Sequence, residues 1–136
     1  MPYRKKRVNI LTPECYAPPG PFVHAVVVGD TIYTTCLGGI DPKTNKLPDD
    51  LVTQTEQAFK NIEAVLKSAG FSYKEVVKAT IFTTDLSQYD MINKVMEKYM
   101  EGNKPARTAA EVSRLPLDMK IKIEVIAVKT DKCEEG

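Results

Sequence analysis

The sequence predicts an α+β fold, in which a mixed six-stranded sheet carries two helices on one face. Two segments repeat apolar residues at helical spacing, and the other apolar segments are short, rich in β-branched residues and bounded by glycine or proline. Their order is strands, helix, strand, helix, strands. A helix that crosses between two strands favours a right-handed connection and parallel pairing of those strands.

Three strands are expected before the first helix. A short strand is expected at 8–11, and a proline-rich stretch then excludes regular structure. Residues 22–28 and 31–37 are the next two expected strands. Gly29 and Asp30 separate them, and a two-residue link with glycine is typical of a β-hairpin.

The first helix has a well-defined start and end. Asp49 or Asp50 is expected to cap its start, and Gly70 follows its last residue. Ser72 and Glu75 resemble a capping box for a short turn after it. The face that we expect to pack on the sheet carries Leu51, Thr55, Ala58, Phe59, Ile62, Val65, Leu66 and Ala69.

The second half alternates strands with the second helix. Residues 76–84 are apolar on both faces, which predicts a central strand. Ser87 is expected to open the second helix, with Tyr89 on its apolar face. Strands are then expected at 107–112 and 119–128, the last with alternating apolar and charged residues.

One face of this sheet is left without cover. Several strands are apolar on both sides, whereas two helices cover one side, so we expect a homo-oligomer that buries the other face. No linker divides the chain, which predicts a single domain over 1–136, with an N-terminal arm at 1–16 and a flexible tail at 130–136.

The composition is that of an ordinary globular protein. The chain has 136 residues, 43% hydrophobic and 27% charged, and a net charge of +1, which gives no reason to expect nucleic acid or a membrane surface as a partner. No apolar run reaches the roughly 20 residues of a membrane span. The start lacks the pattern of a secretory signal, so the cytoplasm is expected, and the basic residues 4–7 leave a mitochondrial role open.

The cysteines do not predict a disulfide or a metal site. Cys15, Cys36 and Cys133 are far apart, and His24 is the single histidine, so we expect free thiols and no zinc. Cys36 has only His24 to activate it as a nucleophile. A small buried cysteine within a strand is the favoured interpretation.

Arg107 is the strongest candidate for a binding residue. Pro105 restricts the backbone just before it, at the mouth of an expected strand. A guanidinium held there is a fork of donors that suits a carboxylate or a phosphate. A solvated arginine after a turn is the alternative.

Motifs along most of the chain then point to one family. They are Ala-Pro-Pro-Gly-Pro-Phe at 17–22, Asp-Pro-Lys-Thr at 41–44, Val-Lys-Ala-Thr at 77–80, Thr-Asp-Leu at 84–86, Asn93, Pro-Ala-Arg at 105–107, Arg-Leu-Pro at 114–116 and Ile-Glu-Val-Ile-Ala at 123–127. With these motifs the chain resembles the reactive intermediate deaminase family, RidA or YjgF, also described as endoribonuclease L-PSP.

The resemblance implies a fold, an assembly and an activity. It implies a chorismate-mutase-like subunit in a homotrimer with a barrel-like core and ligand clefts between neighbouring subunits. It implies hydrolysis of 2-enamine and 2-imine carboxylates, such as 2-aminoacrylate, to 2-keto acids and ammonia. No metal or organic cofactor is implied.

The resemblance also suggests which residues bind the substrate. Arg107 matches the arginine that pairs with the substrate carboxylate, and Asn93 matches an asparagine near the cleft. Thr35 stands where many members have serine. Phe22 replaces the usual tyrosine, so a phenol donor is lost, and Ala109 replaces a common cysteine.

The largest departure concerns the water that attacks the substrate. Lys122 stands where deaminating members have the glutamate thought to orient that water. A neutral Lys122 beside Arg107 would be a base, Glu124 two residues on would compensate from the same strand face, and a solvated outward lysine is the third interpretation. We therefore expect catalytic roles for Arg107, Lys122 and Glu124, with weak activity.

Two other functions stay open on the sequence. The cleft could bind a 2-keto acid or another small carboxylate without catalysis, as a regulatory protein does. The family's description also suggests endoribonuclease activity or inhibition of translation. In the sequence, only the basic residues 4–7 support this function. Tyr16 is a candidate to replace the missing phenol, whereas a structural role is expected for His24.

Overall fold

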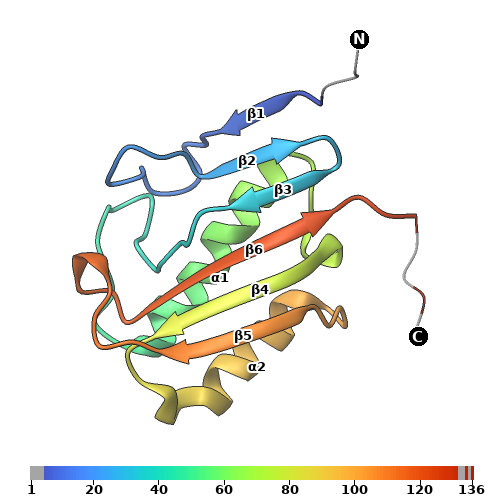
Figure 1. Ribbon diagram of the computed structural model, residues 1–136. Helices are drawn as coiled ribbons and strands as arrows, with labels where there is room; N and C mark the ends of the chain where they lie inside the picture. The colour runs from blue at the N-terminus through green and yellow to red at the C-terminus, as the bar shows by residue number, and fades with distance from the viewer. Residues whose placement is uncertain (1–4, 132–133, 135) are drawn as a thin grey trace.

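The computed structural model describes residues 5–131, 134 and 136. Within them, six strands form one mixed sheet and both long helices, α1 (Leu51–Ser68) and α2 (Tyr89–Met100), lie behind it on one face (Figure 1). The α+β fold class is confirmed. In spatial order the strands are β1 (Arg7–Ile10), β2 (Ala25–Val28), β3 (Thr31–Thr34), β6 (Ile121–Val128), β4 (Val76–Thr83) and β5 (Ala106–Glu111).

The sheet pairs as the order of elements predicts. β4 and β5, which α2 connects, are parallel, and the remaining pairs are antiparallel. β6 lies between β3 and β4 in the middle of the sheet. Alternate residues of β6 are fully buried under the helices, namely Ile121, Ile123, Val125 and Ala127.

Helix α1 provides most of the cover. Its first turn is capped by Asp50, whose carboxylate accepts the Thr53 backbone N–H at 2.8 Å. Phe59, Ile62 and Leu66 are completely buried against the sheet. Each such side chain contributes about 1.5–3 kcal/mol relative to an exposed position, so this face fixes the helix on the sheet.

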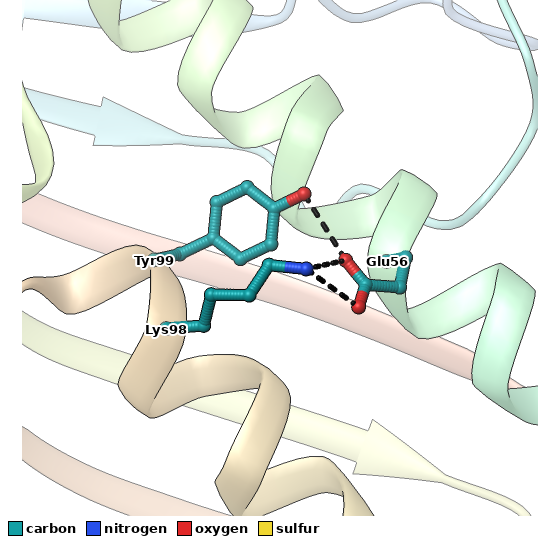
Figure 2. Close-up of polar contacts among 3 residues, drawn as sticks. All are labelled: Glu56, Lys98 and Tyr99. Atoms are coloured by element: carbon teal, nitrogen blue, oxygen red, sulfur yellow. Dashed lines mark hydrogen bonds and ion pairs between the residues drawn. The ribbon is translucent and has the colours of Figure 1, made fainter.

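Helix α2 is held to α1 by a small cluster at their contact. The Phe59 and Tyr99 rings stack with centroids 5.4 Å apart. Lys98 and Tyr99 both donate to the Glu56 carboxylate, at 2.9 Å and 3.2 Å (Figure 2). Because Lys98 is largely exposed, the ion pair contributes little, and the ring contact supplies most of the stabilisation.

Strand β2 begins three residues later than predicted, and the His24 side chain just before it forms an interior crosslink. The His24 Nδ1 accepts the Thr12 N–H at 3.1 Å, and its Nε2 lies 2.7 Å from the Tyr16 carbonyl oxygen. This buried histidine is structural, as expected. The Tyr16 hydroxyl accepts the Gly38 N–H at 2.8 Å in the interior, so it does not replace the phenol that Phe22 lacks.

Strand β3 ends at Thr34 instead of residue 37. Beyond it the Thr35 N–H still donates to the His24 carbonyl oxygen at 2.8 Å, and Leu37 forms an isolated bridge with Ile123 of β6. A Cβ at Gly39 would collide with the backbone of Gln54, so this close approach requires glycine. Cys36 is half-buried and outside the strand, and the prediction of a buried strand cysteine was therefore wrong.

The boundaries of β6 and α2 also differ from the prediction. Leu117 and Asp118 have left-handed backbones, with φ of 60° and 56°, so the strand starts at Ile121 and not at Met119. Ser87 belongs to a short 3₁₀ turn capped by Asp85, and α2 begins only at Tyr89.

The described part of the N-terminal arm belongs to the folded core. β1 pairs with β2, and the Cys15 and Tyr16 side chains are buried. Residues 1–4 and Cys133 lie outside the described residues, as does part of the expected tail. Across the described chain, neither helix is long and apolar enough to cross a membrane, and no cluster of three metal-ligating side chains occurs.

Candidate functional site

Arg107 lies on the edge strand β5, with its side chain toward α2. Its Nη1 donates to Asn93 Oδ1 at 2.5 Å and to Met96 Sδ at 3.6 Å, and its Nη2 donates to the Tyr89 hydroxyl at 2.5 Å. The guanidinium carbon also lies 5.1 Å from the centre of the Tyr89 ring. We call these four residues the Arg107 cluster.

The cluster leaves part of the guanidinium available. Arginine has five N–H donors, of which three are used here, so the Nε–H and one Nη2 hydrogen have no acceptor among the described residues. Arg107 is half-buried and forms no ion pair with any described residue. A fixed, partly desolvated cation without a carboxylate partner is suited to bind an anion.

A hollow of about 610 Å³ begins at Arg107 and runs along the end of α2. Met96 and Met100 give it an apolar wall, and Lys104 lies on the loop before β5. Ala109 follows Arg107 on the same face of β5 and packs partly into the core. The arrangement places an apolar surface next to an anion-binding group, as a small organic acid requires.

The other predicted site residues lie on the sheet face that has no helix. Lys122 and Glu124 alternate with the buried residues of β6, so both point to this open face, as predicted for their shared side of the strand. Cys36 lies beside them, next to the Leu37–Ile123 bridge. Phe22 and Thr35 line a hollow of about 340 Å³ at the end of β2 and β3. We call these five residues the open-face set.

The open-face set has few internal partners. Within the described chain, the side chains of Lys122 and Glu124 form no hydrogen bond and no ion pair. Burial, with a smaller contribution from the charge of Glu124, raises the pKa of the Cys36 thiol to about 12, and Lys122 acts in the opposite direction. The thiol therefore stays protonated near neutral pH, which argues against a nucleophilic cysteine.

The two groups of predicted residues lie on opposite faces of one sheet. Arg107 pairs with Ala79, which is buried under the helices, whereas Lys122 pairs with Phe82 three residues further along β4. An odd separation reverses the face in a strand. Within one chain, Lys122 therefore does not lie beside Arg107, contrary to the first interpretation of Lys122.

Tyr89 is the site residue that the sequence analysis missed. It was assigned to the apolar face of the second helix, yet it is 42% exposed and contacts Arg107. Its position four residues before Asn93 places both side chains on one face of α2, which was the available signal.

Comparisons with known proteins agree on one family. The endoribonuclease L-PSP family profile matches residues 13–129. A RutC family protein of Pyrococcus horikoshii is 40% identical over 88% of this chain and 96% of its own length. The 2-iminobutanoate/2-iminopropanoate deaminase of Escherichia coli is 37% identical over 89% and 97%. The crystal structure of Escherichia coli TdcF with bound serine superposes with a TM-score of 0.87 at 32% identity, covering 90% of this chain and 99% of that one.

Proposed function

Because this chain belongs to the endoribonuclease L-PSP family, the YjgF/RidA family that its motifs indicate, we propose that it hydrolyses short 2-imine and 2-enamine carboxylates to 2-keto acids and ammonia. The observation that carries this proposal is the half-buried Arg107, held by Asn93 and Tyr89 and left with two free N–H donors. The relative from Escherichia coli is named for 2-imino acids, and TdcF binds serine, a small amino carboxylate.

Arg107 would bind the substrate carboxylate through these two donors. A 2-enamine carboxylate first becomes the imine, as a proton moves from its nitrogen to its terminal carbon. Water then adds to the carbon of the C=N bond while a proton passes to the nitrogen, which gives a carbinolamine. Loss of ammonia from the carbinolamine leaves the 2-keto acid. Imines are intrinsically reactive, so orientation of substrate and water supplies most of the catalysis, and no metal or organic cofactor is required.

The water would be oriented by the open-face set of a second copy. Arg107 and Glu124 lie on opposite faces of one sheet, so a site that uses both residues needs two chains. The half-buried apolar residues of the open face, such as Phe82 and Ile126, favour contact with another copy. A homotrimer with clefts between its subunits satisfies both requirements.

Lys122 supports a second candidate function. A protonated lysine donates hydrogen bonds and accepts none, so it does not take over the work of a carboxylate that accepts a proton from water. The Arg107 cluster is unaffected by this change. We therefore propose slow turnover through Glu124, with binding of 2-keto acids without catalysis as the alternative.

The test follows keto-acid release from 2-aminoacrylate that a second enzyme generates in the same solution. Wild-type protein should accelerate release. Arg107→Ala should lower kcat/KM by a factor that corresponds to about 2–5 kcal/mol of lost transition-state stabilisation if the ion pair with substrate is desolvated. Arg114→Ala is the matched control, because the Arg114 side chain is 80% exposed and pairs with Asp118 alone within the part of the chain that the structure describes. We expect that control to act as wild type.

Binding of 2-oxobutanoate, measured by calorimetry, separates the two functions. If wild type binds 2-oxobutanoate but shows no turnover, and Arg107→Ala abolishes that binding, the protein binds keto acids and is not a deaminase. Absence of both binding and turnover would exclude both functions.

A further inference from the structure

Tyr89 has an unusual position for the first residue of a helix. Its hydroxyl accepts the Arg107 Nη2–H at 2.5 Å, and its ring lies under the guanidinium with 5.1 Å between the ring centre and the guanidinium carbon. The side chain is nevertheless 42% exposed. Tyr89 therefore contacts Arg107 from the side on which solvent has access.

The hydrogen of this hydroxyl is unused. A phenol both accepts and donates, and here the oxygen accepts from Arg107. Within the described residues the Tyr89 O–H donates to no acceptor. An O–H donor thus stands next to the two free N–H donors of the guanidinium.

We propose that Tyr89 is a binding residue that completes the carboxylate site, donating its O–H to one oxygen of the anion that Arg107 holds. The inference rests on the anion site of the proposed function and names a further contact in it. A 2-keto or 2-imino carboxylate has two coplanar oxygens, and this arrangement offers three donors to them. The phenol that is absent at Phe22 is then supplied from α2.

The hydroxyl and the ring have separable roles. The ring supports the guanidinium by a cation–π contact, which Tyr89→Phe retains. Only the O–H donor and the acceptor for Nη2 are lost in that variant. Tyr89→Leu removes both the ring contact and the hydroxyl.

Calorimetry with 2-oxobutanoate tests the proposal, because this ligand does not react. Tyr89→Phe should bind it about 10- to 150-fold more weakly than wild type, as expected for one lost hydrogen bond to a charged group, and Tyr89→Leu more weakly still. The matched control is Tyr99→Phe, which removes a phenol of the same helix that donates to Glu56, away from Arg107 (Figure 2). That control should bind as wild type.

A merely structural role would give a different result. Tyr89→Phe should raise KM for 2-aminoacrylate with little change in kcat, because the carboxylate contact is equal in the ground and transition states. Its thermal unfolding should match wild type. Equal affinity of Tyr89→Phe and wild type would overturn the proposal, as would tighter binding, which would identify the hydroxyl as a competitor of the ligand for Arg107.

The outcomes also separate this inference from the proposed function. If wild type binds 2-oxobutanoate without turnover, the deaminase proposal is wrong. The Tyr89 contact is then decided by comparing the affinities of wild type and Tyr89→Phe for 2-oxobutanoate. Wild type that binds no 2-oxobutanoate would overturn the Arg107 site and the Tyr89 contact together.

Discussion

The Arg107 cluster and the open-face set use polar side chains in opposite ways. In the cluster, Asn93 and Tyr89 hold the guanidinium from within the same chain. On the open face, Lys122 and Glu124 have no hydrogen-bonding partner among the described side chains. One chain therefore preorganises the group that binds an anion, whereas the groups that would act on water depend on their surroundings.

The cause lies in the neighbours of each strand. β5 is an edge strand beside α2, and a helix presents residues four apart, such as Tyr89 and Asn93, to the same neighbour. β6 is central, and its outward side has no helix above it (Figure 1). A preformed binding group and an uncovered sheet face on the same subunit are the two features that the proposed two-chain site requires.

Each region is nevertheless held by one asparagine that bridges two carbonyls. Asn61 donates to Gly38 O and Ile40 O, both at 2.9 Å, and so fixes the segment that follows Cys36. Asn103 donates to Tyr73 O at 2.8 Å and Val76 O at 2.9 Å, four residues before Arg107. The supports are alike, so the difference between the regions lies in the functional side chains themselves.

The largest effect is expected from a charge in the middle of the open face. Ile126 of β6 is half-buried between Tyr33 and Lys78 of the neighbouring strands. Ile126→Asp should dissociate the proposed assembly into monomers and remove the proposed turnover, because a buried unpaired carboxylate costs several kcal/mol. Sedimentation and circular dichroism check the size and the fold, with Ile126→Val as the control. A monomer with full turnover would show that one chain suffices.

A smaller effect, an increase in kcat, is expected from Lys122→Glu. This change returns a carboxylate to the position at which the resemblance places the group that orients water, and a positioned base contributes about 10²–10⁴-fold. Because we propose that Glu124 supplies part of that role, we expect about a 10- to 100-fold rise in kcat. Lys46→Glu, an equal charge change in an exposed loop, is the control. An unchanged kcat would mean that Lys122 does not face the reacting water.

Asn61 and Asn103 allow a matched comparison of how much each carbonyl-bridging side chain contributes to stability. Asn61 is almost fully buried and Asn103 half-buried, so Asn61→Ala should cost about 1–3 kcal/mol of stability and Asn103→Ala about 1 kcal/mol. Denaturant unfolding measures both. Asn103→Ala should also weaken 2-oxobutanoate binding, because it releases the loop before Arg107. If Asn61→Ala weakened that binding more, the two regions would not be independent.

The smallest effect concerns pH. The Cys36 pKa is raised from 9.0 to about 12 on folding, mainly by burial, so the folded state keeps a proton that the unfolded state loses. Stability from this group is complete below about pH 9 and declines above it, by at most about 1.4 kcal/mol per pH unit. Cys36→Ser should therefore lose less stability than wild type between about pH 9 and pH 10.5. If the free energy of unfolding fell equally with pH in wild type and in Cys36→Ser, this prediction would be contradicted.

The sequence alone determined the fold class and the parallel pairing of β4 with β5, because these depend on local periodicity and short-range chemistry. It narrowed the helix cap to Asp49 or Asp50, and the structure selects Asp50. It also singled out Arg107 and Asn93, whose contact the structure contains. It did not indicate the His24 crosslink before β2 or the close approach of Gly39 to Gln54, because both depend on contacts outside the local sequence pattern.

Only the tertiary structure decided that Arg107 and Lys122 lie on opposite faces and that Tyr89 joins Arg107. The first depends on the register of three strands, in which a shift of one residue reverses every side chain. The second depends on how α2 docks along β5, which no local pattern specifies.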